Sequence, residues 1–232
     1  MTDVRYLKIN KGEGRRFAIS DIHGCYRTFK LLLKQIRLQK KDQLFILGDM
    51  INRGKNSAKV LNIILSYQAK GYQFYLLRGN HEQRILNAAY KSEEQLIKTL
   101  KKNNSIDLKR AGKEKWQDYL RLMESTYHYF NLDDYLLVHA GFDFSLESPF
   151  EAIHPMLYKR NLKVDKKKLD NKYIVHGHTP QKISTIIQRI KDGKRRICID
   201  NGCINSQTTG EGNLICLNLD SLAVIIQPNS EK

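Results

Sequence analysis

The chain has 232 residues and a formal net charge of +16, because 40 lysines and arginines face 24 aspartates and glutamates. No apolar run approaches the ~18 residues that a membrane helix needs, and the N-terminus lacks the apolar segment of a secretory signal, so we expect a cytoplasmic protein without a membrane partner. The length fits one domain, 1–232, and the charge favours anionic partners; nucleic acid is the least favoured of these, because the lysines are dispersed without interleaved aromatic residues.

Short apolar runs alternate with amphipathic segments in the first third of the chain. The apolar runs predict strands at 16–20, 43–47 and 73–77. Apolar residues at helical spacing predict helices over 26–39 and 58–69. This β-α-β-α-β order predicts a parallel sheet.

The remainder of the chain shows a helical region followed by strands. Residues 82–125 are expected to be mainly helical with a break near 103–104, and a short helix is expected near 150–157. Further strands are predicted at 127–132, 134–139 and 173–176. Two hairpins are predicted, one of 184–190 with 195–199 around the turn Lys-Asp-Gly-Lys, and one of 214–219 with 222–227. The whole pattern indicates a mixed α/β fold.

The chain has four cysteines, and none of them belongs to a C-x-x-C pair. Three lie in or just after predicted strands, where cysteine behaves as a small apolar residue. We expect reduced, structural thiols.

Polar side chains follow five of the predicted strands directly. They belong to the stretches SDIHG, GDMINRG, RGNHE, VHAG and VHGHTP. Because the carboxyl ends of strands in an open α/β sheet converge on one crevice, we expect these side chains to meet there. Aspartate, asparagine and histidine without cysteine ligands favour ions such as manganese, iron or zinc. The expected ligands are Asp21, His23, Asp49, Asn80, His139 and His178.

These residues divide into two ligand sets. Asp21 and His23 are spaced i, i+2 after a strand and can hold one ion. Asp49 can bridge two ions, and the second is completed by Asn80 and the two later histidines. Two metal ions ~4 Å apart can activate a bridging water and clamp a tetrahedral phosphate. The sequence therefore predicts two divalent ions, with manganese favoured and iron or zinc as alternatives.

The same stretches resemble the motif set of the calcineurin-like metallophosphoesterases, especially the short bacterial and phage members of the serine/threonine protein phosphatase family. The resemblance runs from about Arg16 to Asp220, and Ile-Asp-Asn-Gly-Cys at 199–203 resembles a late element of the family. It implies two mixed β-sheets packed face to face with flanking helices. It also implies a phosphatase in which a hydroxide bridging two metals attacks phosphorus in line.

The resemblance also implies roles for residues beside the metals. His81 would act as general acid, and Arg53 would bind the phosphate oxygens through its planar guanidinium. Arg160 resembles a second phosphate-binding arginine, with an ordinary surface arginine as an equal alternative. Arg78 would orient the site, and Glu82 would cap or brace the helix start.

Three other histidines are not expected to act in the chemistry. His176 lies two residues before His178, but its position in the motif favours packing or support over ligation. His128 and His154 have no motif around them.

Asn52 is the departure from the family pattern. Protein phosphatases of this family usually carry aspartate there, paired with the general-acid histidine. Asparagine hydrogen-bonds a ring nitrogen without bringing charge, so we expect His81 to be a weaker base than in those relatives. The related diadenosine tetraphosphate hydrolases also lack that aspartate. The resemblance still implies a phosphatase acting on phosphoserine or phosphothreonine in proteins. Asn52 favours the alternative, a hydrolase of dinucleoside polyphosphates, and a non-catalytic binding module is the third reading.

Overall fold

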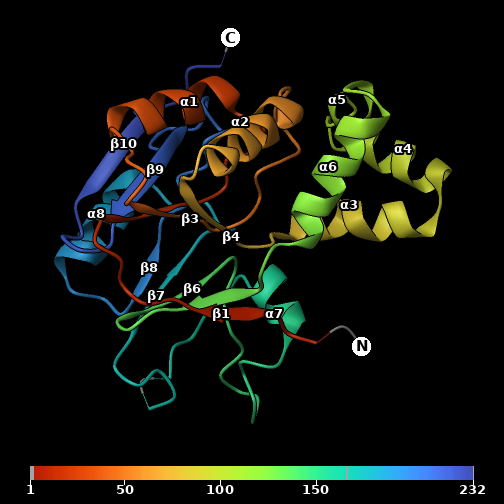
Figure 1. The fold of residues 1–232 in the computed structure, drawn as a ribbon. Coiled ribbons are helices and arrows are strands. Elements are labelled where there is room, and N and C mark those ends of the chain that lie inside the picture. The colour runs from red at the N-terminus through yellow and green to blue at the C-terminus, as the bar shows by residue number, and fades with distance from the viewer. Residues whose placement is uncertain (1–2, 166, 232) are drawn as a thin grey trace.

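Two five-stranded sheets pack face to face in the computed structural model, which describes residues 3–165 and 167–231 (Figure 1). One sheet has the strand order β10-β9-β2-β3-β4 and the other β1-β5-β6-β7-β8. The strands are β1 (Tyr6–Lys8), β2 (Arg16–Ile19), β3 (Gln43–Ile46), β4 (Gln73–Leu76), β5 (Tyr129–Asn131), β6 (Tyr135–Val138), β7 (Tyr173–His176), β8 (Arg196–Cys198), β9 (Asn213–Asn218) and β10 (Val224–Pro228). The predicted sandwich of two mixed sheets with flanking helices is confirmed.

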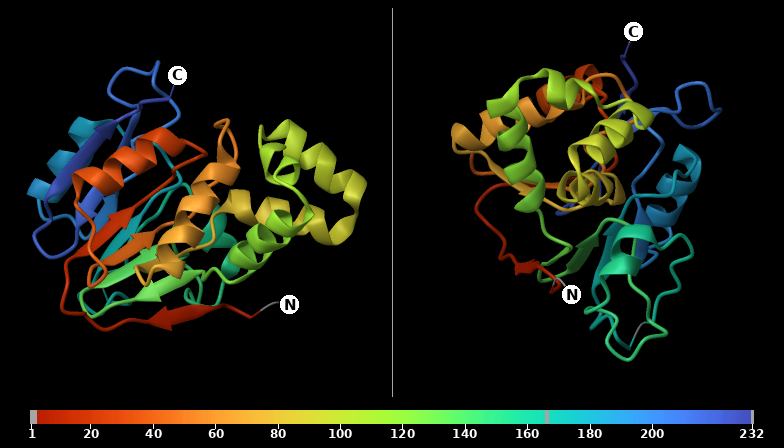
Figure 2. Two further views of the ribbon diagram at one scale, coloured as in Figure 1. Left: turned by 45° about the horizontal axis from the view of Figure 1, so that its top comes forward. Right: turned by 90° about the vertical axis from the view of Figure 1, so that its right-hand side faces the viewer.

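The helices lie outside the sandwich. They are α1 (Tyr26–Gln35), α2 (Ser57–Ala69), α3 (Asn80–Lys91), α4 (Glu93–Lys102), α5 (Asp107–Arg110), α6 (Lys113–Glu124), α7 (Ile153–Tyr158) and α8 (Ile183–Lys191). Helices α1 and α2 cover the outer face of the first sheet, whereas α3 to α6 project beside it as a helical arm, residues 80–124 (Figures 1 and 2). No helix in the described part of the chain is long and apolar enough to cross a membrane.

Strand direction brings the loops that carry the motifs to one edge. Strands β2, β3 and β4 pair in parallel, as do β6, β7 and β8, while β9 runs antiparallel to β2 and β5 antiparallel to β6. Residues that follow parallel neighbours therefore emerge side by side. The predicted convergence of strand ends is confirmed.

Apolar residues alternate between two cores. Ala18 and Phe45 face the second sheet, where they join a buried cluster with Leu137 and Val175. Their neighbours along the strands turn to the other face and pack under α1 and α2, as Ile46 does. Since both faces of these parallel strands are covered, the strands read as continuous apolar runs in the sequence.

One predicted strand is a helix. Residues 184–190 were expected to form a hairpin strand, but Ile183–Lys191 is α8. Its apolar residues Ile183, Ile186 and Ile190 are spaced i, i+3, i+7 and pack on the core between the sheets. Gly193, which resembled a hairpin turn, has φ 61° just after the helix, where glycine commonly ends an α-helix.

Smaller differences lie at the ends of elements. The helical region expected at 82–125 begins at Asn80 and comprises the four helices of the arm. Strand β1 was not predicted; it is a short edge strand that pairs in parallel with β5. The hairpin of β9 and β10 and the short helix near 150–157 are confirmed, and all four cysteines are buried and reduced. The single domain 1–232 stays a prediction and includes positions 1–2, 166 and 232, which lie outside the described residues.

Candidate metal centre

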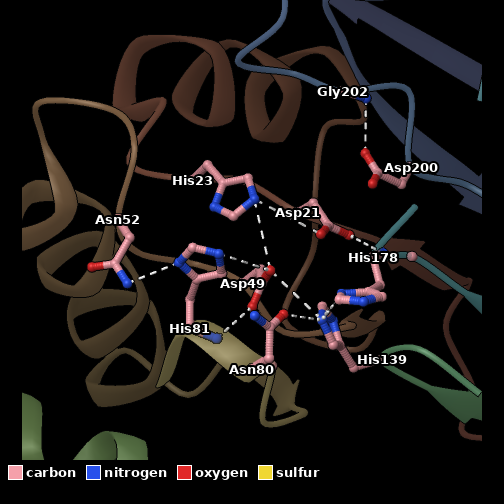
Figure 3. Close-up of polar contacts among 12 residues, drawn as sticks. Asp21, His23, Asp49, Asn52, Asn80, His81, His139, His178, Asp200 and Gly202 are labelled. Atoms are coloured by element: carbon pink, nitrogen blue, oxygen red, sulfur yellow. Dashed lines mark hydrogen bonds and ion pairs between the residues drawn. The ribbon is translucent and has the colours of Figure 1, made fainter. Parts of the chain in front are cut away.

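The structure brings the six expected ligands together from five strand ends (Figure 3). Asp21 and His23 lie in the loop after β2, and Asp49 lies in the loop after β3. Asn80 begins α3 after β4. The remaining two ligands, His139 and His178, follow β6 and β7. All are buried except His178, which is half-buried, so their positions are fixed by packing.

Asp49 is the centre of this arrangement. Its Oδ2 lies 3.7 Å from His23 Nε2 and 3.6 Å from His139 Nε2. The ligand atoms of His23, Asp49 and His81 lie within 4.8 Å of one another, and so do those of Asp49, His139 and His178. Asp21 adjoins the first group, with Oδ1 4.0 Å from His23 Nε2. Asp49 is thus common to both groups, as a bridging ligand must be, and His81 lies closer to the first group than the sequence indicated.

Backbone carbonyls orient two of the imidazoles. His23 Nδ1 lies 3.1 Å from the Ile51 carbonyl and His139 Nδ1 lies 2.8 Å from that of Leu47. A carbonyl only accepts, so each neutral ring carries its proton on Nδ1 and turns the lone pair of Nε2 inward. There His139 Nε2 meets Asn80 Oδ1 at 3.1 Å. Two lone pairs facing each other without a proton between them fit a bound cation, which is the arrangement expected of metal ligands.

Two glycines leave room for the carboxylates. A Cβ built on Gly79 would overlap Asp49 Oδ1, and one built on Gly177 would overlap Asp21 Oδ2. His178 N–H donates to Asp21 Oδ2 at 3.0 Å, and His81 N–H donates to Asp49 Oδ1 at 3.0 Å. Backbone that approaches this closely holds one oxygen of each carboxylate and leaves the other directed at the histidines.

We expect Gly79→Ala to displace the Asp49 carboxylate. The added methyl group has no space, so the free energy of unfolding should fall by about 2 kcal/mol, and metal affinity should fall with it. Urea unfolding and metal titration measure the two effects. Gly12→Ala is the control, because its Cβ would make only ordinary contact with Gln43, 3.5 Å away. Equal stability of the two variants would contradict the close approach at Gly79.

Electrostatics at the centre also fit cations. Burial, together with repulsion from Asp21 and Glu82, raises the pKa of Asp49 well above its ordinary value. Burial lowers the pKa of His23 to about 4, and that of His178 also to about 4. Buried carboxylates surrounded by neutral imidazoles lack a positive counter-charge inside the cluster. The donor set therefore fits divalent metal ions.

Backbone strain is concentrated in the same loops. Six non-glycine residues of the site have φ between 22° and 71°, a region that side chains with a Cβ rarely adopt. They are Asp21, His23, Asp49, Asn52, Arg53 and His178. Neighbouring contacts must hold these conformations against their cost.

Glu82 supplies several of those contacts. Its carboxylate is fully buried and accepts hydrogen bonds from the N–H groups of Gly79, Asp49, Met50 and Ile51, at 2.9 to 3.3 Å. It therefore joins the loop after β3 to the start of α3. Glu82 caps the helix start, as expected, and at the same time fixes the backbone of Asp49.

The position of Asn52 matches its expected partner. Asn52 Nδ2 lies 2.9 Å from His81 Nδ1 (Figure 3). Because the amide nitrogen donates, the neutral imidazole carries its proton on Nε2, which faces the metal ligands 3.9 Å from Asp49 Oδ2. Burial, followed by the charge of neighbouring groups including His23 and Arg84, lowers the pKa of His81 to about 2. At neutral pH the ring is thus a neutral hydrogen-bond donor.

The expected arginines separate into two groups. Arg53 and Arg160 line a cavity of about 350 Å³ together with Asn80, His81 and His178, so the structure places both beside the candidate metal ligands. Arg78 points elsewhere: it binds Gln83 and Thr126 and the carbonyls at the end of α6. Arg78 therefore joins the start of α3 to the end of α6, and its expected role in orienting the site stays a prediction.

His176 and Asp200 complete the surroundings. His176 is buried beside the site with Nδ1 3.0 Å from the Gly177 carbonyl, which agrees with packing or support. Asp200 was not among the expected site residues, yet it is buried after β8, and burial with repulsion from Asp21 raises its pKa. The signal was present, because Asp200 follows an apolar strand directly, as Asp21 does. His128 accepts a hydrogen bond from the Arg5 N–H, and His154 stacks on Tyr158.

Comparison with known proteins decides the family. Residues 15–203 match the family model of the calcineurin-like phosphoesterases. The chain belongs to this family. A symmetrical bis(5'-nucleosyl)-tetraphosphatase from Buchnera aphidicola is 38% identical over 102 residues, which are 44% of this chain and 34% of the relative. The chain spans 31–44% of the length of the curated relatives it matches.

Solved structures agree on the fold of this calcineurin-like phosphoesterase. A protein provisionally described as a diadenosine tetraphosphatase superimposes with a TM-score of 0.72 at 17% identity, over 99% of this chain and 100% of the other. A protein serine/threonine phosphatase from Saccharomyces cerevisiae superimposes with a TM-score of 0.65 at 16% identity, over 99% and 84% of the two chains. These similarities show the shared sandwich.

Proposed function

We propose that this calcineurin-like phosphoesterase is a metal-dependent hydrolase that cleaves dinucleoside polyphosphates. The observation that carries the proposal is the sharing of Asp49 by two ligand clusters directly beside the cavity of Arg53 and Arg160. Relatives named as tetraphosphatases support this substrate class over the phosphoserine and phosphothreonine that the sequence favoured.

The side chains of the site would divide the work as follows. Asp21, His23 and Asp49 would hold one ion, and Asp49 with Asn80, His139 and His178 the other. When bound, the two ions would supply an activated water as nucleophile and neutralise charge on the phosphate. Arg53 and Arg160 would orient the phosphate through their guanidinium groups. His81 would direct its Nε2–H at the leaving group.

The pairing of His81 with Asn52 supports an anhydride as substrate. A phosphate ester releases an alkoxide, which needs a proton from a general acid. A polyphosphate releases a phosphate group, which is a stable anion and needs only a hydrogen bond. The neutral imidazole held by Asn52 Nδ2 provides a hydrogen bond but no positive charge. The site therefore suits the better leaving group.

A phosphomonoesterase acting on proteins is the second candidate. The side chains of Arg53 and Arg160 are exposed, so a phosphorylated side chain on another protein can reach the cavity that they line. A phosphorylated serine or threonine releases an alkoxide, and the neutral His81 held by Asn52 is a weak proton donor for that leaving group.

A substrate panel on manganese-loaded protein tests the proposal. It compares diadenosine tetraphosphate with phosphoserine, phosphothreonine and phosphotyrosine peptides and a cyclic nucleotide. We expect kcat/KM for diadenosine tetraphosphate to exceed that for the peptides by about tenfold or more. A preference for phosphoserine or phosphothreonine peptides would establish the second candidate instead. Absence of turnover for every substrate, in protein whose metal content is verified, would reject catalysis.

A further inference from the structure

We propose that Arg84 of α3 and Lys102 of α4 bind the phosphates beyond the one that is cleaved, and so make the site selective for a polyphosphate chain. This inference rests on the proposed function of the same site. The helical arm thereby contributes two of the four cationic side chains that line the cavity.

The cavity beside the metal ligands has more positive charge than one phosphate needs. Four cationic side chains line it, and no carboxylate is among the lining residues. They are Arg53, Arg84, Lys102 and Arg160. A phosphate group at the metals is served by two of them, Arg53 and Arg160. The other two, which belong to the arm, remain free for further negative charge.

Arg84 is oriented toward this cavity. It lies three residues after His81, so both side chains are on one face of α3. Its Nη1 donates to Asn103 Oδ1 at 3.2 Å, which ties the guanidinium to the turn after α4. A guanidinium held at one side still has free N–H groups for phosphate oxygens.

Lys102 is the last residue of α4, directly before the same turn, and it lines the cavity. The Arg53 N–H donates to the Asn103 carbonyl at 2.8 Å, and Asn104 Nδ2 donates to the Arg53 carbonyl at 2.9 Å. These two bonds fix Arg53, whose φ of 64° is unusual for a side chain with a Cβ. The turn thus fixes the arginine beside the metal ligands and presents Lys102 next to it.

The chemical class of the ligand follows from where these four cationic side chains lie. A single phosphate uses the metal ligands and two arginines, whereas linked phosphates extend to Arg84 and Lys102. All four cationic side chains are exposed. The end of a bound polyphosphate that is farthest from the metal ligands would therefore face solvent, so a nucleoside can be attached to that end. The predicted ligand class is therefore a linear polyphosphate, free or esterified at its ends.

Direct binding to metal-free protein tests the inference. Inorganic tripolyphosphate and orthophosphate are titrated calorimetrically into the parent chain and into the double variant R84Q/K102Q. We expect the affinity for tripolyphosphate to fall about tenfold or more, and that for orthophosphate by about twofold at most. The control is Lys98→Gln, an exposed lysine of the same helix outside the cavity lining, which should change neither affinity.

Two results of the titrations would overturn the inference: an unchanged affinity for tripolyphosphate in the double variant, or an equal loss of affinity for both anions. The proposed function fails independently, on the substrate panel. If diadenosine tetraphosphate is not hydrolysed but R84Q/K102Q still loses tripolyphosphate selectively, the polyphosphate site stands without that reaction. If it is hydrolysed and its KM is the same in both proteins, Arg84 and Lys102 have no role in binding.

Discussion

Asp49→Ala is expected to abolish catalysis, with kcat reduced by about a thousandfold or more, because the variant removes the one carboxylate shared by both ligand clusters. Metal content after dialysis should fall by the equivalent of at least one ion. Phosphate release and elemental analysis of the same samples measure both effects.

Asp49→Asn tests the charge of this side chain separately from its size and shape, which the substitution preserves. The amide keeps an oxygen for the His81 N–H and removes a buried charge that repels Asp21 and Glu82. The metal-free Asp49→Asn protein should therefore melt at a higher temperature than the metal-free parent, although it is inactive. Full activity in either variant would show that the ligand assignment is wrong.

Asn52→Asp is expected to move specificity toward phosphate esters. A carboxylate beside His81 Nδ1 would stabilise the imidazolium and raise the pKa of His81 from its lowered value. Each unit of increase is about tenfold in the protonated fraction while the pKa lies below the assay pH. We therefore expect the turnover of a phosphoserine peptide, relative to p-nitrophenyl phosphate, to rise about tenfold or more.

The pH–rate profile gives the sign of this effect. Activity that depends on protonated His81 is lost as pH rises through its pKa, so a higher pKa moves the alkaline limb of the profile to higher pH. Asn52→Ala is the matched control, because it removes the hydrogen bond without adding charge and should not raise the ratio. Identical profiles for Asn52→Asp and the parent would contradict a role for Asn52 in setting the acid.

The sequence was sufficient for the parts of the site that depend on strand ends. Asp21, Asp49 and Asn80 each follow a buried apolar run, and parallel pairing carries their positions into one place. Asp200 obeys the same rule, because it follows the buried apolar residues at the end of β8. Apolar runs in the sequence thus predict the strands, and the strand ends predict where these polar side chains lie.

Features that depend on tertiary contacts were not predictable. Helix α8 was mistaken for a strand because an Asp-Gly pair ends helices as well as hairpins. Arg84 and Lys102 lie 18 positions apart in charged helices, and only the folding of the arm brings them to one cavity. The motif around Arg78 did not reveal its partners, which are Gln83 of α3, Thr126 and the carbonyls at the end of α6.

The four hydrogen bonds to Glu82 have a consequence for how the protein loses its function. They connect the ligand loop of β3 to the helix that follows β4, so neither can loosen while the other stays ordered. A buried carboxylate deprived of these donors is strongly unfavourable, which makes partial opening costly. We therefore expect that inactivation by heat and melting of the first sheet occur together, as one cooperative transition.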